Sequence, residues 1–197
     1  MPPTGDAGDH RAGLTAFTSV ARRVPQAAWR APTPCSEWDA AALVEHVIGF
    51  HQYLLLAPLG VRAHRPRVGT LGRWLATERA IESVLDDPDA LERPASYFDG
   101  ATRRPVELLP SLADDTLVHT WDLAQAVGLP DGLDADLCAG AYARARRQVA
   151  GRAESGLYAA PVAVPEDASV QDRLLGLLGR DPRWRAPGPA SPNGARG

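Results

Sequence analysis

The sequence predicts an all-α protein, a helix bundle followed by a short C-terminal extension. Apolar residues recur at helical spacing in successive segments, and Pro- or Gly-containing stretches separate these segments. The 197 residues fit one domain that is large enough to bury its own core. We expect the bundle to cover residues 1–185 and the Pro-, Gly- and Ala-rich residues 186–197 to form a disordered tail.

The N-terminal part predicts two helices. The first covers residues 9–24, and the prolines of residues 25–34 end it. A capping box follows, in which Ser36 is the N-cap residue and Asp39 reaches back to it. This box opens a second helix that runs to Leu56.

Two more helices are separated by a long connection. The third helix is expected over residues 71–85. Residues 86–110 are rich in Pro, Asp and Arg, show no clear periodicity and predict a connection that lies over the bundle and admits the substrate. The fourth helix begins at Ser111 and is ended by Gly128. Because this helix has apolar residues on both faces, we expect it to be central.

The C-terminal part predicts a fifth, amphipathic helix over residues 134–150 with an Arg-rich outer face. Residues 161–165 form a short extended piece. Ser169 then caps a short Leu-rich helix that stops at Gly179.

Ionisable side chains on the inner faces of two helices indicate a binding site. His46 lies on the apolar stripe of the second helix, and Asp115, His119 and Asp122 share the inner face of the fourth. Burying such groups is costly unless they are paired or bound to something. Asp115 and His119 are four residues apart and reach one point, where His46 completes a three-ligand set.

Two imidazoles and a carboxylate form a donor set typical of catalytic zinc, with a fourth position left open. Nickel suits the same donors. In this interpretation His46, Asp115 and His119 are the metal ligands, and Asp122 orients an imidazole N–H or exchanges a proton during catalysis. The alternative interpretation is structural: His46 is a core histidine, Asp115 and His119 form a local pair, and Asp122 is a cap or an ion-pair partner.

The other candidate residues predict no second site. His51 lies far round the helix from His46, and His10 and His64 are expected at the surface. Cys35 precedes a helix N-terminus, which favours nucleophilic cysteines, but the sequence shows no basic partner for it.

Composition excludes several classes of partner. A net charge of −3 predicts neither a nucleic-acid groove nor an anionic membrane surface, and no apolar run approaches membrane-spanning length. Two cysteines and no signal-peptide pattern indicate a reduced, cytoplasmic protein. Every basic residue other than histidine is Arg, which is typical of a GC-rich bacterial genome.

A resemblance to a known family rests on three segments in order. They are Pro32–Trp38 followed by Leu43–Gly49, then Val118–Ala124, and finally Leu174–Trp184. These segments resemble the DinB-like superfamily, in the branch related to the N-terminal domain of mycothiol-dependent maleylpyruvate isomerase. The similarity extends from about Leu14 to Trp184.

The resemblance implies a four-helix bundle with a divalent metal between its helices. The histidines of the family pattern fall on His46 and His119, and its third ligand, a glutamate, falls on Asp115. The family implies a transferase or isomerase that uses mycothiol on a small-molecule substrate, in a chain that forms a homodimer. The larger isomerases carry a further C-terminal domain, so we do not expect their reaction itself to carry over. A metal-dependent hydrolase and a non-catalytic metal- or ligand-binding protein are the alternatives.

Overall fold

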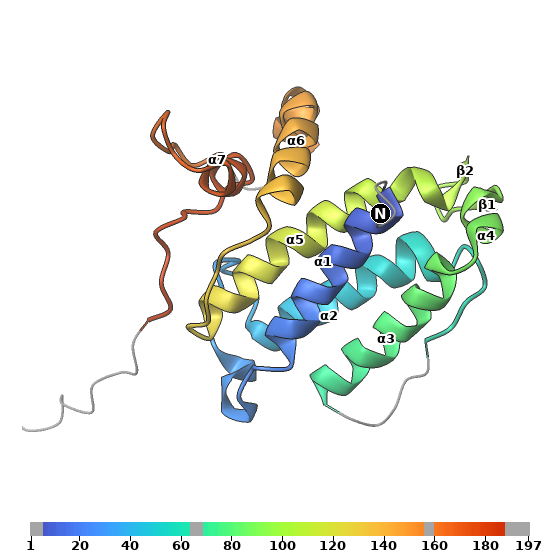
Figure 1. Ribbon diagram of the computed structural model, residues 1–197, viewed down its shortest axis with the longest axis horizontal. Helices are drawn as coiled ribbons and strands as arrows, with labels where there is room; N and C mark the ends of the chain where they lie inside the picture. Colours follow the sequence, from blue (N-terminus) through green and yellow to red (C-terminus); the bar gives the residue numbers. More distant parts are fainter. Residues whose placement is uncertain (1–5, 64–68, 156–159, 188–197) are drawn as a thin grey trace, which may run out of the picture.

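The computed structural model describes residues 6–63, 69–155 and 160–187, and its described residues are mostly helical. This confirms the predicted all-α class. Four helices form the bundle: α1 (Asp6–Ala21), α2 (Ala40–His51), α3 (Thr70–Leu85) and α5 (Leu109–Ala126). Helix α1 packs against α5 and α3, while α2 packs against α3 and α5 (Figure 1).

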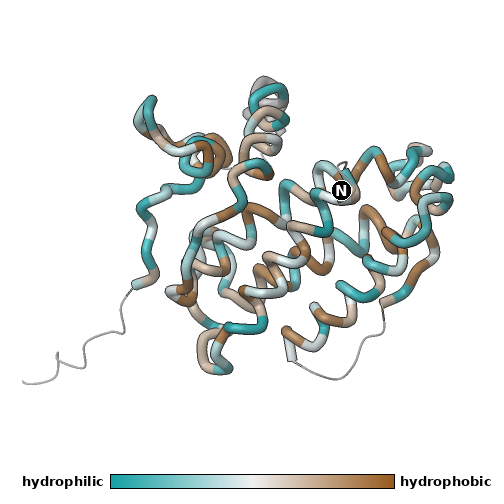
Figure 2. The backbone as a smooth tube through the Cα atoms, viewed as in Figure 1, coloured by the Kyte–Doolittle hydropathy of each residue, from teal (hydrophilic) through white to brown (hydrophobic). Residues whose placement is uncertain are grey.

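Each bundle helix buries one apolar stripe, as its spacing predicts. In α1 the fully buried residues Leu14, Phe17 and Ala21 recur every three or four positions. The ring of Phe17 meets Trp74 of α3 edge to face at 4.7 Å, and the Trp74 indole donates to Thr18 Oγ1 at 2.8 Å. Hydrophobic and hydrophilic positions alternate along the helices of the tube (Figure 2).

Helix α5 is central, as expected, because it lies between two cores. One core fills the four-helix bundle. The other joins Leu117, Val118 and Trp121 of α5 to the C-terminal helices α6 (Ala135–Ser155) and α7 (Val170–Leu177). Most residues of α5 are therefore buried, including the polar residues Thr116, His119, Thr120, Asp122 and Gln125.

The start of α2 differs from the prediction. Asp39, not Ser36, is the N-cap residue, and its carboxylate accepts from the backbone N–H of Ala42 at 2.8 Å. An isolated bridge pairs Pro32 with Asp39, and Ser36 lies in a turn between them in which the Trp38 N–H donates to the Cys35 carbonyl oxygen at 2.8 Å, so the α-helix begins only after Asp39. After His51 the helix continues as a π-helical segment, η2 (Gln52–Leu56), so helical structure does reach Leu56.

Residues 86–110 are more structured than the sequence predicts. They contain a short helix, α4 (Pro88–Glu92), and a two-stranded antiparallel hairpin of β1 (Ala95–Ser96) and β2 (Thr102–Arg103). A 3₁₀ turn, η3 (Pro105–Leu108), leads into α5, and another, η1 (Gln26–Arg30), follows α1. Elements of two to five residues are too short to produce a periodic pattern.

The C-terminal extension follows the expected order. Helices α6 and α7 pack on each other beside the bundle (Figure 1). Ser169 caps α7 by accepting from the backbone N–H of Asp172, and Gly179 has φ +81°, which ends the helix as predicted. From residue 188 the expected disordered tail lies outside the described residues. Within the described part of the chain, no helix has the length and apolar character to cross a membrane.

Candidate metal centre

The structure brings together the three residues expected to bind a metal. His46 comes from α2, and Asp115 and His119 come from α5. Asp115 Oδ1 lies 3.4 Å from His46 Nε2 and 3.5 Å from His119 Nε2, and the two imidazole centroids are 4.9 Å apart. The aspartate, although one methylene shorter than the glutamate of the family pattern, therefore reaches both imidazoles.

Asp115 has unused binding capacity at this point. Its second oxygen, Oδ2, is buried and has no hydrogen-bond partner among the described residues. Burial alone would raise the pKa of Asp115, but the imidazoles of His119 and His46 outweigh it and hold that pKa below its usual range. A carboxylate that is ionised, buried and only partly satisfied is a favourable ligand for a cation.

The fully buried Asp122 holds the other side of the His119 ring. Its Oδ2 lies 2.9 Å from His119 Nδ1, one turn further along α5. Burial alone would lower the pKa of His119, but Asp115 and Asp122 outweigh it and raise that pKa well above the usual value. With Nδ1–H donated to Asp122, the Nε2 atom faces Asp115 and His46, which is the orientation that a ligand histidine needs.

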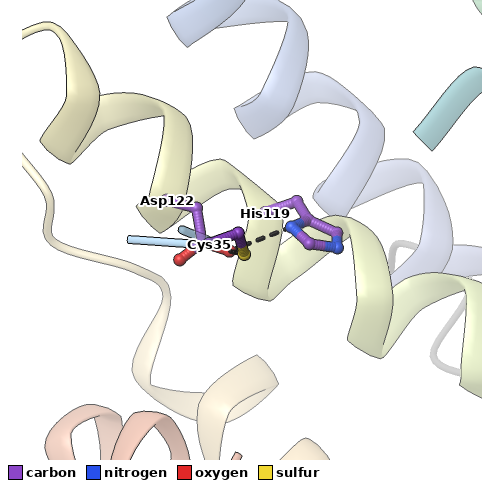
Figure 3. Close-up of side chains that lie close together, drawn as sticks. All are labelled: Cys35, His119 and Asp122. Carbon is purple, nitrogen blue, oxygen red and sulfur yellow. Dashed lines mark hydrogen bonds and ion pairs between the residues drawn. The ribbon is translucent and has the colours of Figure 1, made fainter. Parts of the chain in front are cut away.

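A cysteine and an arginine from distant parts of the chain complete this polar cluster. The Cys35 thiol donates to Asp122 Oδ2 at 3.4 Å, beside His119 (Figure 3). Arg180, which follows α7, donates from Nη2 to Asp122 Oδ2 at 3.2 Å and to Cys35 Sγ at 3.4 Å. A basic partner for Cys35 could not be seen in the sequence because Arg180 lies 145 residues further along the chain.

Two aromatic rings fix His46. Trp38 stacks on its imidazole with centroids 4.4 Å apart and planes 28° apart. Phe50 stacks with it at 5.9 Å and 14°. Stacked rings restrict χ rotation, so they hold the His46 ring in place, whereas among the described residues it has no second hydrogen-bonding partner like that of His119.

A cavity of about 500 Å³ opens over this centre. Its lining includes His46, Asp115 and His119, together with residues 34–38 and 179–180. Residues 86–110, expected to admit the substrate, do not line it. A cavity of this size suits a small organic ligand.

Two overlapping sets of donor atoms in the described chain have the spacing of a metal site. One is His46, Asp115 and His119; the other is Cys35, His119 and Asp122, and within each set the atoms lie within 4.8 Å of one another. In the second set the Arg180 guanidinium already supplies a cation to the sulfur and the carboxylate. Each set also contains a buried carboxylate oxygen that has no partner among the described residues, Asp115 Oδ2 in the first and Asp122 Oδ1 in the second, so the difference between the sets is Arg180. The first set is therefore the better fit for a metal ion.

Two other histidines form a buried pair that the sequence did not predict. His10, expected at the surface, is fully buried and stacks on the fully buried His51 with centroids 5.1 Å apart. The spacing of His10, Leu14 and Phe17 on one stripe of α1 was the available signal. His51 lies off the metal set, as predicted, and its Nδ1 lies 2.8 Å from the Val47 carbonyl oxygen. His64 lies outside the described residues.

Comparison with known families decides the relationship. A profile described as the mycothiol maleylpyruvate isomerase N-terminal domain matches residues 10–129, more than half of the chain. The chain belongs to this family. The match includes His46, Asp115, His119 and Asp122 and confirms the resemblance to the DinB-like superfamily.

The chain is also similar to two uncharacterised proteins of Mycobacterium tuberculosis, one from strain CDC 1551 and one from strain H37Rv. Each is 27% identical over 187 residues, which cover 88% of this chain and 97% of the relative. No solved structure gives a significant match. The matched family is therefore a mycothiol-related, isomerase-like one.

Proposed function

We propose that this protein is a divalent-metal-dependent enzyme that uses a small thiol, mycothiol in the family context, in a transferase or isomerase reaction. The ligands are His46, Asp115 and His119, and zinc is the preferred ion. The observation that supports this most is Asp115, whose Oδ1 lies between two imidazole Nε2 atoms and whose Oδ2 is buried without a partner at the base of an open cavity.

The donor set leaves room for a substrate atom. Three protein ligands are the pattern of catalytic zinc, whereas structural zinc sites use four. When bound here, the metal would supply Lewis acidity and hold a coordinated thiol as its thiolate at neutral pH. The cavity of about 500 Å³ would accommodate both that thiol and an electrophilic substrate.

The chain's own residues have separate tasks in this proposal. Asp122 keeps the Nδ1 proton of His119 in place, which leaves Nε2 free as a ligand. Trp38 and Phe50 hold the ring of His46 at the angle that the site needs. Arg180 balances the charge of the buried Asp122, so that this carboxylate stays ionised next to His119.

Cobalt substitution tests the proposal directly. Cobalt(II) bound by nitrogen and oxygen alone lacks the near-ultraviolet charge-transfer band that a bound thiolate produces. We expect the Cys35→Ser variant loaded with cobalt to lack this band until a small thiol is added, and to gain it then. The serine variant ensures that the sulfur comes from the added thiol.

Three outcomes would contradict the proposed function in whole or in part. If cobalt binds and added thiol leaves the spectrum unchanged, thiol chemistry is refuted and a hydrolase or a metal-binding protein remains. If His46→Ala binds cobalt as tightly as the parent, the ligand set is wrong. If the protein takes up no cobalt or zinc, the metal-dependent function fails altogether.

A further inference from the structure

A second cavity lies where the β1–β2 hairpin and the end of α4 meet the turn that follows η2. It has a volume of about 530 Å³, and residues 57–59 and 93–98 line it. None of these residues lines the cavity over the metal centre, and the hairpin lies at the other end of the molecule from α7 (Figure 1). The protein therefore has a concave surface that the proposed metal chemistry does not use.

This second cavity contains a positive charge that no carboxylate neutralises. Arg93 is the one charged residue among the described residues that line it, and its guanidinium makes no ion pair or hydrogen bond with another described residue. The neighbouring arginines are paired: Arg103 with Asp99 at 2.6 Å, and Arg104 with Glu92 and Glu107 at 2.9 and 2.8 Å. Glu92, the carboxylate next to Arg93 in the chain, is thus held by another arginine, and Arg93 is left for an external anion.

An aromatic surface borders the same cavity. Phe98, a lining residue, and Tyr53 of η2 are the two large hydrophobic side chains that the described residues leave exposed, at 73% and 47%. Their rings stack with centroids 5.1 Å apart and planes 12° apart. Residues 57–59, Ala-Pro-Leu, add an apolar wall. Exposed apolar surface beside a cavity is typical of a binding site, and stacked rings suit a flat, unsaturated ligand.

The hairpin wall also contains a hydrogen-bond donor without a partner. Tyr97 is 7% exposed, and its hydroxyl makes no hydrogen bond within the part of the chain that the structure describes. Burial raises the pKa of Tyr97, so the hydroxyl stays protonated and is available to an acceptor such as a carboxylate oxygen. Buried polar groups without a partner are rare in folded proteins, and a bound molecule that pairs with this one would account for it.

We propose that this cavity binds a small aromatic carboxylate, with its carboxylate on Arg93 and its flat apolar body against Phe98 and the wall of residues 57–59. A guanidinium forms two parallel charge-assisted hydrogen bonds with a carboxylate, which fixes the orientation of the ligand. Inorganic phosphate would leave the aromatic surface uncovered. A metal ion does not fit, because the described lining residues include no carboxylate, imidazole or thiol.

Isothermal titration calorimetry of the metal-free full-length protein with cinnamate tests the proposal. We expect one cinnamate to bind per chain. Cinnamamide, which has the same shape without the charge, should bind about tenfold more weakly, as loss of a charge-assisted hydrogen bond implies. Arg93→Gln should weaken cinnamate binding by about the same factor and remove most of the preference for cinnamate over cinnamamide. Phe98→Ser should weaken the binding of both compounds.

Two control variants locate the site. Arg79→Gln removes an exposed arginine of α3 that lies outside the cavity lining, and it should bind cinnamate like the wild type. His46→Ala alters the cavity over the metal centre and should also leave binding unchanged. Circular dichroism of each variant shows whether the fold is intact.

Four results would overturn the proposal. They are the absence of saturable binding in the wild type, equal affinity for cinnamate and cinnamamide, wild-type affinity in folded Arg93→Gln, and loss of binding in folded His46→Ala. Because the titration uses metal-free protein and a cavity that shares no lining residue with the metal centre, a failure of the proposed metal function leaves its outcome unaffected.

Discussion

Replacing Asp122 with asparagine tests how the metal site is held together. The change keeps the shape of the side chain but removes the charge that lies 2.9 Å from His119 Nδ1. Removing such an outer partner of a ligand histidine reduces metal affinity by about 10- to 100-fold, or about 1.4–2.7 kcal/mol. We expect the zinc dissociation constant of Asp122→Asn to rise by this factor.

Competition with a chromogenic zinc chelator at fixed pH measures the change. The matched control is Asp114→Asn, which removes another carboxylate of α5 that is paired with an arginine, Arg144, at 2.6 Å. Asp114 lies outside the lining of the cavity, so its variant should bind zinc like the wild type. Wild-type zinc affinity in Asp122→Asn, or an equal loss in Asp114→Asn, would refute the role given to Asp122.

The remaining predictions concern stability. Burial first, then the neighbouring His51 and Arg11, holds the pKa of His10 well below 6.5. As the pH falls below about 6.5, the unfolded chain therefore binds a proton at this position that the folded chain does not. The free energy of unfolding of the wild type should then fall, relative to that of His10→Phe, by about 1.4 kcal/mol per pH unit until the folded pKa is reached. Urea unfolding of both proteins at pH 7.5 and 5.5 measures this difference. The same change in the free energy of unfolding for both proteins would contradict it. Gly176→Ala should destabilise by about 1–3 kcal/mol in thermal unfolding, because its Cβ would lie 2.7 Å from the Val162 carbonyl oxygen. At Gly49 of α2, an added Cβ would have no neighbouring atom within 4 Å, so Gly49→Ala should instead raise the stability of the protein by up to about 1 kcal/mol. A loss of stability in this variant would contradict the helix at this position.

Helices and their ends could be read from the sequence because their causes are local. The apolar stripes of α1, α3 and α5 come from spacing alone, and Gly179 and Ser169 end and start helices through their own backbone and side chain. Ser36 is not the N-cap because it lies in a turn that is closed by a bridge between Asp39 and Pro32, a residue outside the capping box.

Sequence spacing alone could predict the part of the site that lies on a single helix. Asp115, His119 and Asp122 lie on one helix, so their common face follows from helical geometry. The contact of Cys35 with Arg180 joins residues 145 positions apart, and no periodicity reports such a pair. The sequence therefore predicts the candidate metal set and Asp122 beside it, but not the contact of Cys35 with Arg180 or the stacking of Trp38 on His46.

The most direct test of the account is the zinc content of the purified, dialysed protein, measured by mass spectrometry in the wild type, His46→Ala and Cys35→Ser. His119 belongs to both candidate donor sets, so these two variants distinguish them. We expect one zinc per chain in the wild type and in Cys35→Ser, and loss of zinc in His46→Ala. Zinc retained in His46→Ala and lost in Cys35→Ser, or absent from a wild type incubated with zinc, would contradict it.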